Sequence, residues 1–114
     1  MRVIIAGSRT ISDRTIVEKA IKDSGFLITE VVCGGASGVD AVGRQYAFDN
    51  NIRCSLFPAE WDKFKKRAGP IRNRAMAEYA DALIAVWDGK SRGTWSMMRE
   101  MERLNKPVVG VIPL

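Results

Sequence analysis

Three short loops in this sequence combine glycines with hydroxyl or basic side chains, a pattern typical of phosphate-binding sites. They are Gly7-Ser8-Arg9, the Gly-Gly-Ala-Ser-Gly turn at 34–38, and the Gly-Lys-Ser-Arg-Gly-Thr loop at 89–94. Glycines let backbone amides approach a ligand closely, and a helix that begins after such a loop favours an anion. Each loop alone is equally consistent with an ordinary tight turn. Together they predict a ligand that carries phosphate.

Polar side chains in these loops extend the predicted site. Arg9 offers a guanidinium to a phosphate or carboxylate, with a surface pair to Asp13 as the alternative. Asp40 either stabilises the first turn of its helix or accepts hydrogen bonds from ribose hydroxyls, and the sequence leaves both open. Hydroxyl groups at expected helix starts cap the helix, bind the anion or do both: Ser8, Ser37 and Thr94.

The composition restricts the chemistry that these residues can perform. The 114 residues include no histidine and two cysteines, Cys33 and Cys54. Nucleophile pairs that need histidine, histidine-ligated zinc and four-cysteine sites are therefore excluded within this chain. We predict no metal and no cofactor, and two reduced, buried cysteines rather than a disulfide. Any catalysis must use carboxylates, arginines or bound water.

The positive charge is concentrated in one segment. The net charge is +5, and residues 63–74 hold six basic side chains and no acid, so the rest of the chain carries −1. Such a segment indicates an anionic partner, with a solvated surface loop as the alternative reading of its lysines. Nucleic acid is one candidate partner. A stacking surface for single strands usually offers more aromatic side chains than Trp61 and Phe64.

Apolar runs alternate with helix-like patterns along the whole chain, and we expect one domain over residues 1–114. Strands are predicted at 3–6, 28–33, 52–57, 82–87 and 108–112, with loops at 59–69 and 88–93. The intervening helices run from Ser12 or Asp13 to Gly25, across 39–47, from Pro70 to residue 80, and across 97–104. Apolar strands that alternate with helices predict an α/β fold with parallel strands covered on both faces. Right-handed crossovers make this a doubly wound, Rossmann-like five-stranded sheet. The pattern alone does not fix the strand order, and we expect the common order 3-2-1-4-5.

In that strand order the three glycine loops lie together. They follow strands 1, 2 and 4, whose carboxyl ends are neighbours at the point where the strand order reverses. The dinucleotide pattern G-x-G-x-x-G is missing after strand 1, and a Walker A loop would need glycine at Ile84. No apolar run approaches the length of a membrane helix, and the N-terminal run is too short for a signal peptide. We expect a cytoplasmic protein that binds a nucleotide by another arrangement.

These features together resemble the SLOG superfamily, which includes the cytokinin-activating LOG phosphoribohydrolases and the DNA-processing protein A. The similarity spans nearly the whole chain and is greatest to the small stand-alone branch found in phages and bacteria. The matching segments are AGSR at 6–9, GGASGVD at 34–40, FPAEW at 57–61, GPIRNRAM at 69–76 and GT at 93–94. The resemblance implies a fold that binds a nucleotide or nucleotide-derived molecule, and a homo-oligomer of two or more chains. Membrane partners are not expected.

The catalytic residues of the phosphoribohydrolases carry over only in part. Their arginine on the helix before strand 4 matches Arg72. Their glutamate, which should follow Gly93-Thr94, is missing, and the next acid is Glu100. Cleavage through an oxocarbenium-like state loses a large electrostatic contribution without a placed carboxylate. Arg72, Asp88 and Glu100 remain weak catalytic candidates. Whether the chain is an enzyme stays open, and we favour a non-catalytic sensor or sequestering protein over a nucleotide N-glycosidase and over a nucleic-acid-binding protein.

The family position of Arg72 places it in the crevice and its neighbour Arg74 on the surface, while Asn73 is expected to contact base or ribose. We expect a valine at Gly35 or Gly38 to block the ligand and leave the protein folded. The predicted ligand-binding residues are Gly7, Ser8, Arg9, Gly34, Gly35, Ala36, Ser37, Gly38, Asp40, Arg72, Asn73, Gly93 and Thr94.

Overall fold

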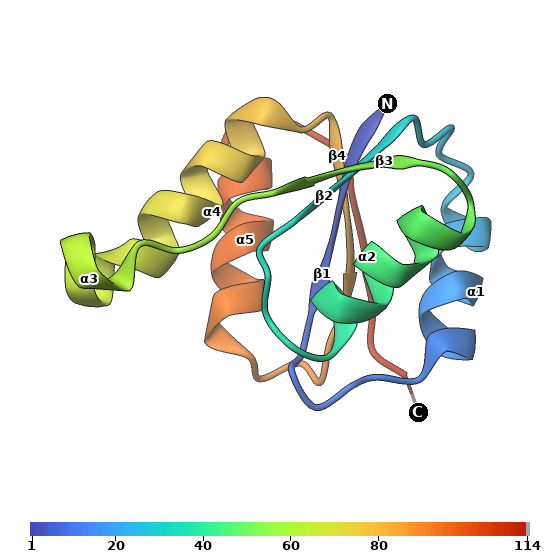
Figure 1. Ribbon diagram of the computed structural model, residues 1–114, viewed down its shortest axis with the longest axis horizontal. Coiled ribbons are helices and arrows are strands. Elements are labelled where there is room, and N and C mark those ends of the chain that lie inside the picture. The colour runs from blue at the N-terminus through green and yellow to red at the C-terminus, as the bar shows by residue number, and fades with distance from the viewer. Residues whose placement is uncertain (114) are drawn as a thin grey trace.

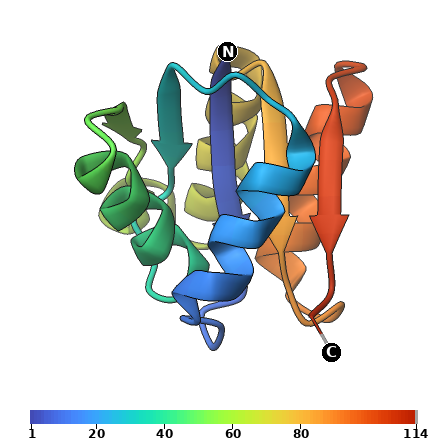
Figure 2. The ribbon, with the colours of Figure 1, turned by 90° about the vertical axis from the view of Figure 1, so that its right-hand side faces the viewer.

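The computed structural model describes residues 1–113, and its centre is one sheet of five parallel strands. The strands are β1 (Arg2–Gly7), β2 (Glu30–Cys33), β3 (Arg53–Leu56), β4 (Ala82–Val86) and β5 (Val108–Val111). They lie in the order β3-β2-β1-β4-β5, which confirms the predicted topology. In Figure 2 the sheet is seen with β1 at its centre and the carboxyl ends of the strands pointing downward.

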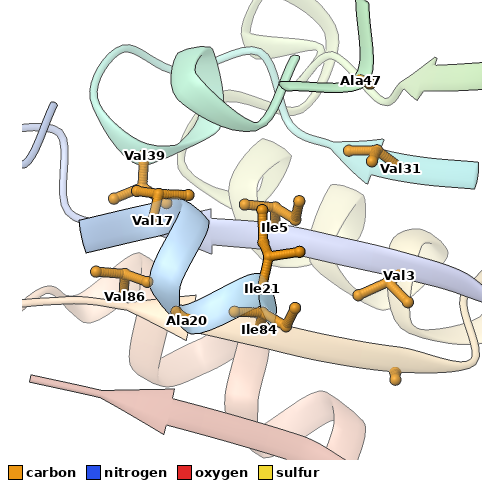
Figure 3. Close-up of a cluster of buried hydrophobic side chains, with 11 residues drawn as sticks. Val3, Ile5, Val17, Ala20, Ile21, Val31, Val39, Ala47, Ile84 and Val86 are labelled. Atoms are coloured by element: carbon orange, nitrogen blue, oxygen red, sulfur yellow. The ribbon is translucent and has the colours of Figure 1, made fainter. Parts of the chain in front are cut away.

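Two layers of helices cover the sheet (Figure 1). On one face lie α1 (Arg14–Ser24) and α2 (Val39–Asp49), and on the other lie α4 (Ala68–Tyr79) and α5 (Arg92–Arg103). Successive side chains of a strand point to opposite faces, so β1 contributes Ile5 to one core and Ile4 to the other. Figure 3 shows Ile5 and Ile84 of the sheet packed with Val17 and Ile21 of α1.

The helix ends follow the predicted signals in part. The side chain of Asp13, rather than that of Ser12, caps α1 by accepting a hydrogen bond from the Thr15 amide, and Gly25 ends this helix with φ +71°. The loop predicted at 88–93 is shorter than expected, because Ser91 caps α5 and the helix already begins at Arg92. The helix begins earlier than predicted because the Ser91 hydroxyl accepts a hydrogen bond from the Thr94 amide in the first turn.

The loop predicted at 59–69 is wrong in its detail. It contains the short helix α3 (Trp61–Phe64) and the 3-10 turn η1 (Lys65–Arg67), and α4 starts at Ala68. Pro70 is thus the third residue of α4 rather than the first. Its missing N–H costs nothing there, because the first four amides of a helix have no partner within the helix. In Figure 1, α3 projects away from the body of the domain.

The two cysteines are neighbours but differ in exposure. Both are free thiols, and their Sγ atoms lie 3.6 Å apart across β2 and β3. Cys33 is buried, and this burial raises the pKa of its thiol to about 12. Cys54 is exposed, so the expectation that both cysteines are buried is wrong for this residue. The cause is topological, because β3 is an edge strand with few elements over it.

No helix within residues 1–113 combines the length and the apolar character that a membrane crossing requires.

Glu30 gives the fold a testable pH dependence at the edge of the sheet where the strands begin. Its buried carboxylate accepts hydrogen bonds from the Tyr79 hydroxyl and from Ser55 Oγ, and the bond from Tyr79 is the main cause that lowers the pKa of Glu30. A group whose pKa is lowered by folding adds stability above its unfolded pKa, and this contribution disappears as the pH falls through the folded pKa. We expect Tyr79→Phe to lower the free energy of unfolding at pH 7 by about 1.5–3 kcal/mol.

Denaturant unfolding at pH 7 and at pH 3 measures this effect. The difference between the wild type and Tyr79→Phe should narrow at the lower pH, because a protonated Glu30 no longer accepts a charge-assisted bond. Tyr46→Phe is the matched control, since within residues 1–113 the Tyr46 hydroxyl has no hydrogen-bond partner. If the difference in free energy of unfolding between the wild type and Tyr79→Phe is the same at both pH values, the role of Glu30 ionisation is contradicted.

Candidate functional site

Ser8 connects the three glycine loops at the carboxyl edge of the sheet. Its carbonyl oxygen accepts a hydrogen bond from the Val39 amide at the start of α2, 3.3 Å away. Its Oγ accepts one from the Asp88 amide in the loop after β4, at 3.0 Å. Figure 2 shows the loops after β1, β2 and β4 together at the lower edge. The loops therefore converge as predicted, and buried Ser8 holds them in place.

The turn between β2 and α2 presents unused hydrogen-bond donors. Gly35 and Gly38 have φ values of +84° and +72°, a left-handed conformation that glycine adopts without strain. Across the described residues, the amides of Gly35, Ser37 and Gly38 have no acceptor, and no side chain caps the start of α2. Unpaired amides at the N-terminus of a helix form an anion site when they lie on a glycine turn. This feature is the strongest sign of a binding site in the structure.

Asp40 lies inside the turn rather than over it. Its side chain is buried, at 6% exposure, and its Oδ2 accepts a hydrogen bond from the Ala36 amide at 3.3 Å. Burial raises the pKa of this carboxyl, while the Ala36 amide and the Arg72 guanidinium oppose that rise. The bond that the structure shows belongs to neither role considered from the sequence, because Asp40 holds the glycine turn before the helix rather than the first turn of the helix or a ribose.

Arg72 reaches the same turn from α4. Its Nη1 donates to the Gly34 carbonyl at 2.7 Å, and its Nε donates to Asn73 Oδ1 at 2.9 Å. Its Nη2 has no acceptor in the part of the chain that the structure describes. Arg74 points elsewhere: its side chain is 61% exposed and pairs with Glu100. The two arginines therefore diverge as expected, with Arg72 at the crevice.

The glycines of the turn make room for parts of the protein itself. A Cβ at Gly34 would lie 2.3 Å from Arg72 Nη1, and one at Gly38 would lie 2.4 Å from the Ser8 carbonyl oxygen. At both positions the group that excludes a side chain is therefore a neighbouring residue. These contacts argue against the expectation that a Gly38→Val protein stays folded, because the new side chain would collide with the backbone of Ser8 and Arg9. At Gly35 a Cβ would lie 3.1 Å from Leu56 Cδ1, a tighter contact than is usual.

Asn73 joins α4 to α5, and Thr94 holds the start of α5. Asn73 Nδ2 donates to the Gly93 carbonyl at 3.3 Å, while its Oδ1 accepts from Arg72. Thr94 Oγ1 lies 3.0 Å from Ser91 Oγ. Asn73 and Thr94 are buried, so the contacts that the structure shows for them are with the protein. They position Arg72 and the start of α5 rather than face open space.

The remaining charged candidates differ in their surroundings. Asp88 Oδ1 accepts from the Lys90 and Ser91 amides, which lower the pKa of its carboxyl. Glu100 pairs with Arg74 and Arg103 on the outer side of the helical layer. Arg9 is exposed, and its expected alternative pairing with Asp13 is absent among residues 1–113.

Sequence reasoning missed a groove beside Arg72. It has a volume of about 280 Å³ and lies between the end of β3 and the helices α3 and α4. Its wall is mainly apolar, and its two charged residues are Glu60 and Arg72. The apolar lining residues are Leu56, Phe57, Pro58, Phe64, Ala68, Ile71 and Ala75. A second hollow, of about 530 Å³, is lined by Lys63 to Arg67 on the projecting segment. In the sequence, FPAEW at 57–61 is visible only as a motif. No local pattern shows that its residues line a groove together with Ile71 of α4, so the groove could not be predicted.

Comparison with known proteins gives consistent matches. Residues 1–64 match the sequence profile of the YspA, cpYpsA-related SLOG family (YAcAr). The Gene 61 protein of Mycobacterium phage D29 is 36% identical over 118 residues, covering 95% of this chain and 94% of that protein. The fold is similar to that of DNA processing protein A from Streptococcus pneumoniae, with a TM-score of 0.80 and 19% identity. That match covers 99% of this chain and 50% of the other, so this chain spans half of its length.

Proposed function

The chain belongs to the YspA, cpYpsA-related SLOG family, and on that basis we propose that it binds a nucleotide or nucleotide-derived molecule at the carboxyl edge of its sheet. It acts as a sensor or a sequestering protein. The observation that carries the proposal is the set of unpaired amides at Gly35, Ser37 and Gly38 at the start of α2. These donors suit a phosphate group, whose oxygens accept several hydrogen bonds at once.

Two arginines complete the charge of the proposed phosphate site. Among residues 1–113 Arg72 Nη2 has no acceptor, while the other two guanidinium nitrogens hold the group against Gly34 and Asn73. A group held in this way loses little further entropy when it binds a ligand. Arg9 follows β1 at the same edge and is exposed, so its guanidinium is available to a phosphate there.

The state of the three candidate carboxylates supports binding without turnover. Asp40 is buried within the turn, Asp88 accepts two backbone amides, and Glu100 is paired with two arginines. A glycosidase needs a carboxylate that can stabilise an oxocarbenium ion or activate water. We therefore expect little or no free base to be released from nucleoside monophosphates at high protein concentration and long incubation, as measured by chromatography. Multiple turnover that is lost in Asp88→Asn or Glu100→Gln, but not in Glu102→Gln, would contradict this expectation.

Native mass spectrometry of the purified protein tests the function itself. The expected result is a stoichiometric bound species that denaturation releases as an intact nucleotide-type molecule. Calorimetric titration with nucleoside monophosphates and ribose 5-phosphate then gives affinities. Binding to single-stranded oligonucleotides alone, with affinity that falls steeply as salt rises, would instead assign the basic residues 63–67 to nucleic acid and overturn the proposal.

A further inference from the structure

We propose that the groove between the end of β3 and the helices α3 and α4 holds the base of the ligand whose phosphate lies on the glycine turn. This inference rests on the function proposed above and adds to it a second subsite with its own chemistry. The occupant is a flat aromatic base, carried by the same molecule as the phosphate.

The groove and the glycine turn share two side chains. Arg72 lines the groove and also donates from Nη1 to the Gly34 carbonyl. Leu56 lines the groove as well, and its Cδ1 would lie 3.1 Å from a Cβ at Gly35. The apolar wall therefore begins where the turn ends. Arg72 and Leu56 are the side chains at which the two subsites adjoin.

The lining fits an aromatic ring better than a sugar or a second phosphate. Leu56 and Ile71 are 52% and 42% exposed, and at this place they present aliphatic surface that nothing in residues 1–113 covers. A planar base would bury both, and its face could stack on the planar guanidinium of Arg72. The volume of about 280 Å³ is close to the lower end of the range for small-molecule sites, roughly 300 Å³, which suits one base rather than a large ligand.

The experiment compares ligands that share a phosphate and differ in the base. Calorimetry measures the binding of adenosine, guanosine, cytidine and uridine 5′-monophosphates and of ribose 5-phosphate. We expect the wild type to bind its preferred monophosphate at least about tenfold more tightly than ribose 5-phosphate. Ile71→Glu places a carboxylate on the apolar wall beside Arg72, so it should weaken the binding of the preferred monophosphate by a larger factor than that of ribose 5-phosphate, and this advantage should disappear.

Matched variants separate this result from general damage. Leu27→Glu changes a residue that is 82% exposed and lies beyond the N-terminal edge of the sheet. It should therefore preserve the wild-type ratio of monophosphate affinity to ribose 5-phosphate affinity. If Ile71→Glu does not fold, as judged by circular dichroism, Leu56→Ala removes part of the same wall and should reduce the ratio several-fold.

Three other outcomes overturn the inference. A wild type that binds ribose 5-phosphate as tightly as every monophosphate leaves the phosphate site intact and shows that the groove takes no base. An Ile71→Glu protein that keeps the ratio but changes from an oligomer to a monomer, as measured by light scattering, shows that a second copy of the chain occupies the groove. If no monophosphate and no ribose 5-phosphate bind, the proposed function fails, and this subsite fails with it.

Discussion

Arg72→Ala is expected to weaken nucleotide binding by about 10- to 100-fold. The guanidinium would make a charge-assisted contact to the ligand, and such contacts contribute about 1.5–3 kcal/mol, or roughly one to two powers of ten in affinity. The same change removes the donor to the Gly34 carbonyl, so a modest loss of stability should accompany it. Calorimetry for affinity and denaturant unfolding for stability measure the two effects separately.

Arg74→Ala is the matched control for this prediction. It removes the same charge two residues further along α4, at a side chain that is 61% exposed and pairs with Glu100. Its affinity should stay within about twofold of the wild type, because surface ion pairs contribute little. If the two variants lose the same factor in nucleotide affinity, the effect comes from the loss of a positive charge anywhere on α4 and not from the position of Arg72.

Gly38→Ala is expected to destabilise the protein by about 3 kcal/mol or more. Two penalties combine there. The backbone is left-handed at φ +72°, and a Cβ would lie 2.4 Å and 2.5 Å from the carbonyl oxygens of Ser8 and Arg9. Because neither oxygen belongs to a flexible side chain, the turn itself must move, and the loop after β1 must move with it.

Gly25→Ala gives the cost of a positive φ without a collision. Gly25 has φ +71° and ψ 5°, a left-handed helical conformation that a side chain tolerates better than the φ +72° and ψ −130° of Gly38, and among residues 1–113 a Cβ there would meet no atom within 4 Å. Its substitution should therefore cost only the conformational strain, about 1–2 kcal/mol. Urea unfolding of the two variants measures the difference. Equal losses in the free energy of unfolding would show that the loops can move apart at little cost. The glycine turn would then be more adaptable than its geometry indicates.

The alternation of strands and helices could be predicted from local patterns, and the common strand order for such a chain then brings the three loops together. Apolar runs such as 82–86 indicate buried parallel strands, and parallel strands joined by helices have few allowed arrangements. The divergence of Arg72 and Arg74 was predictable for the same reason, since two residues along a helix correspond to about 200° of rotation. The segment 59–69 was mispredicted because one helical turn is too short to show a periodicity.

The roles of the individual site residues depended on distances that no local pattern contains. Nothing near Asp40 in the sequence shows that its carboxylate is enclosed by the glycine turn. Similarly, the side chain that packs against Gly34 belongs to Arg72, 38 residues later in the chain. The amino-acid sequence by itself determined the sheet, its helical layers and the edge at which the glycine loops meet, because these follow from hydrophobic periodicity and chain connectivity. Only the tertiary structure decided which amides stay unpaired, which glycines accommodate protein atoms and where an apolar groove opens, because each of these results from the packing of segments that are distant in the sequence.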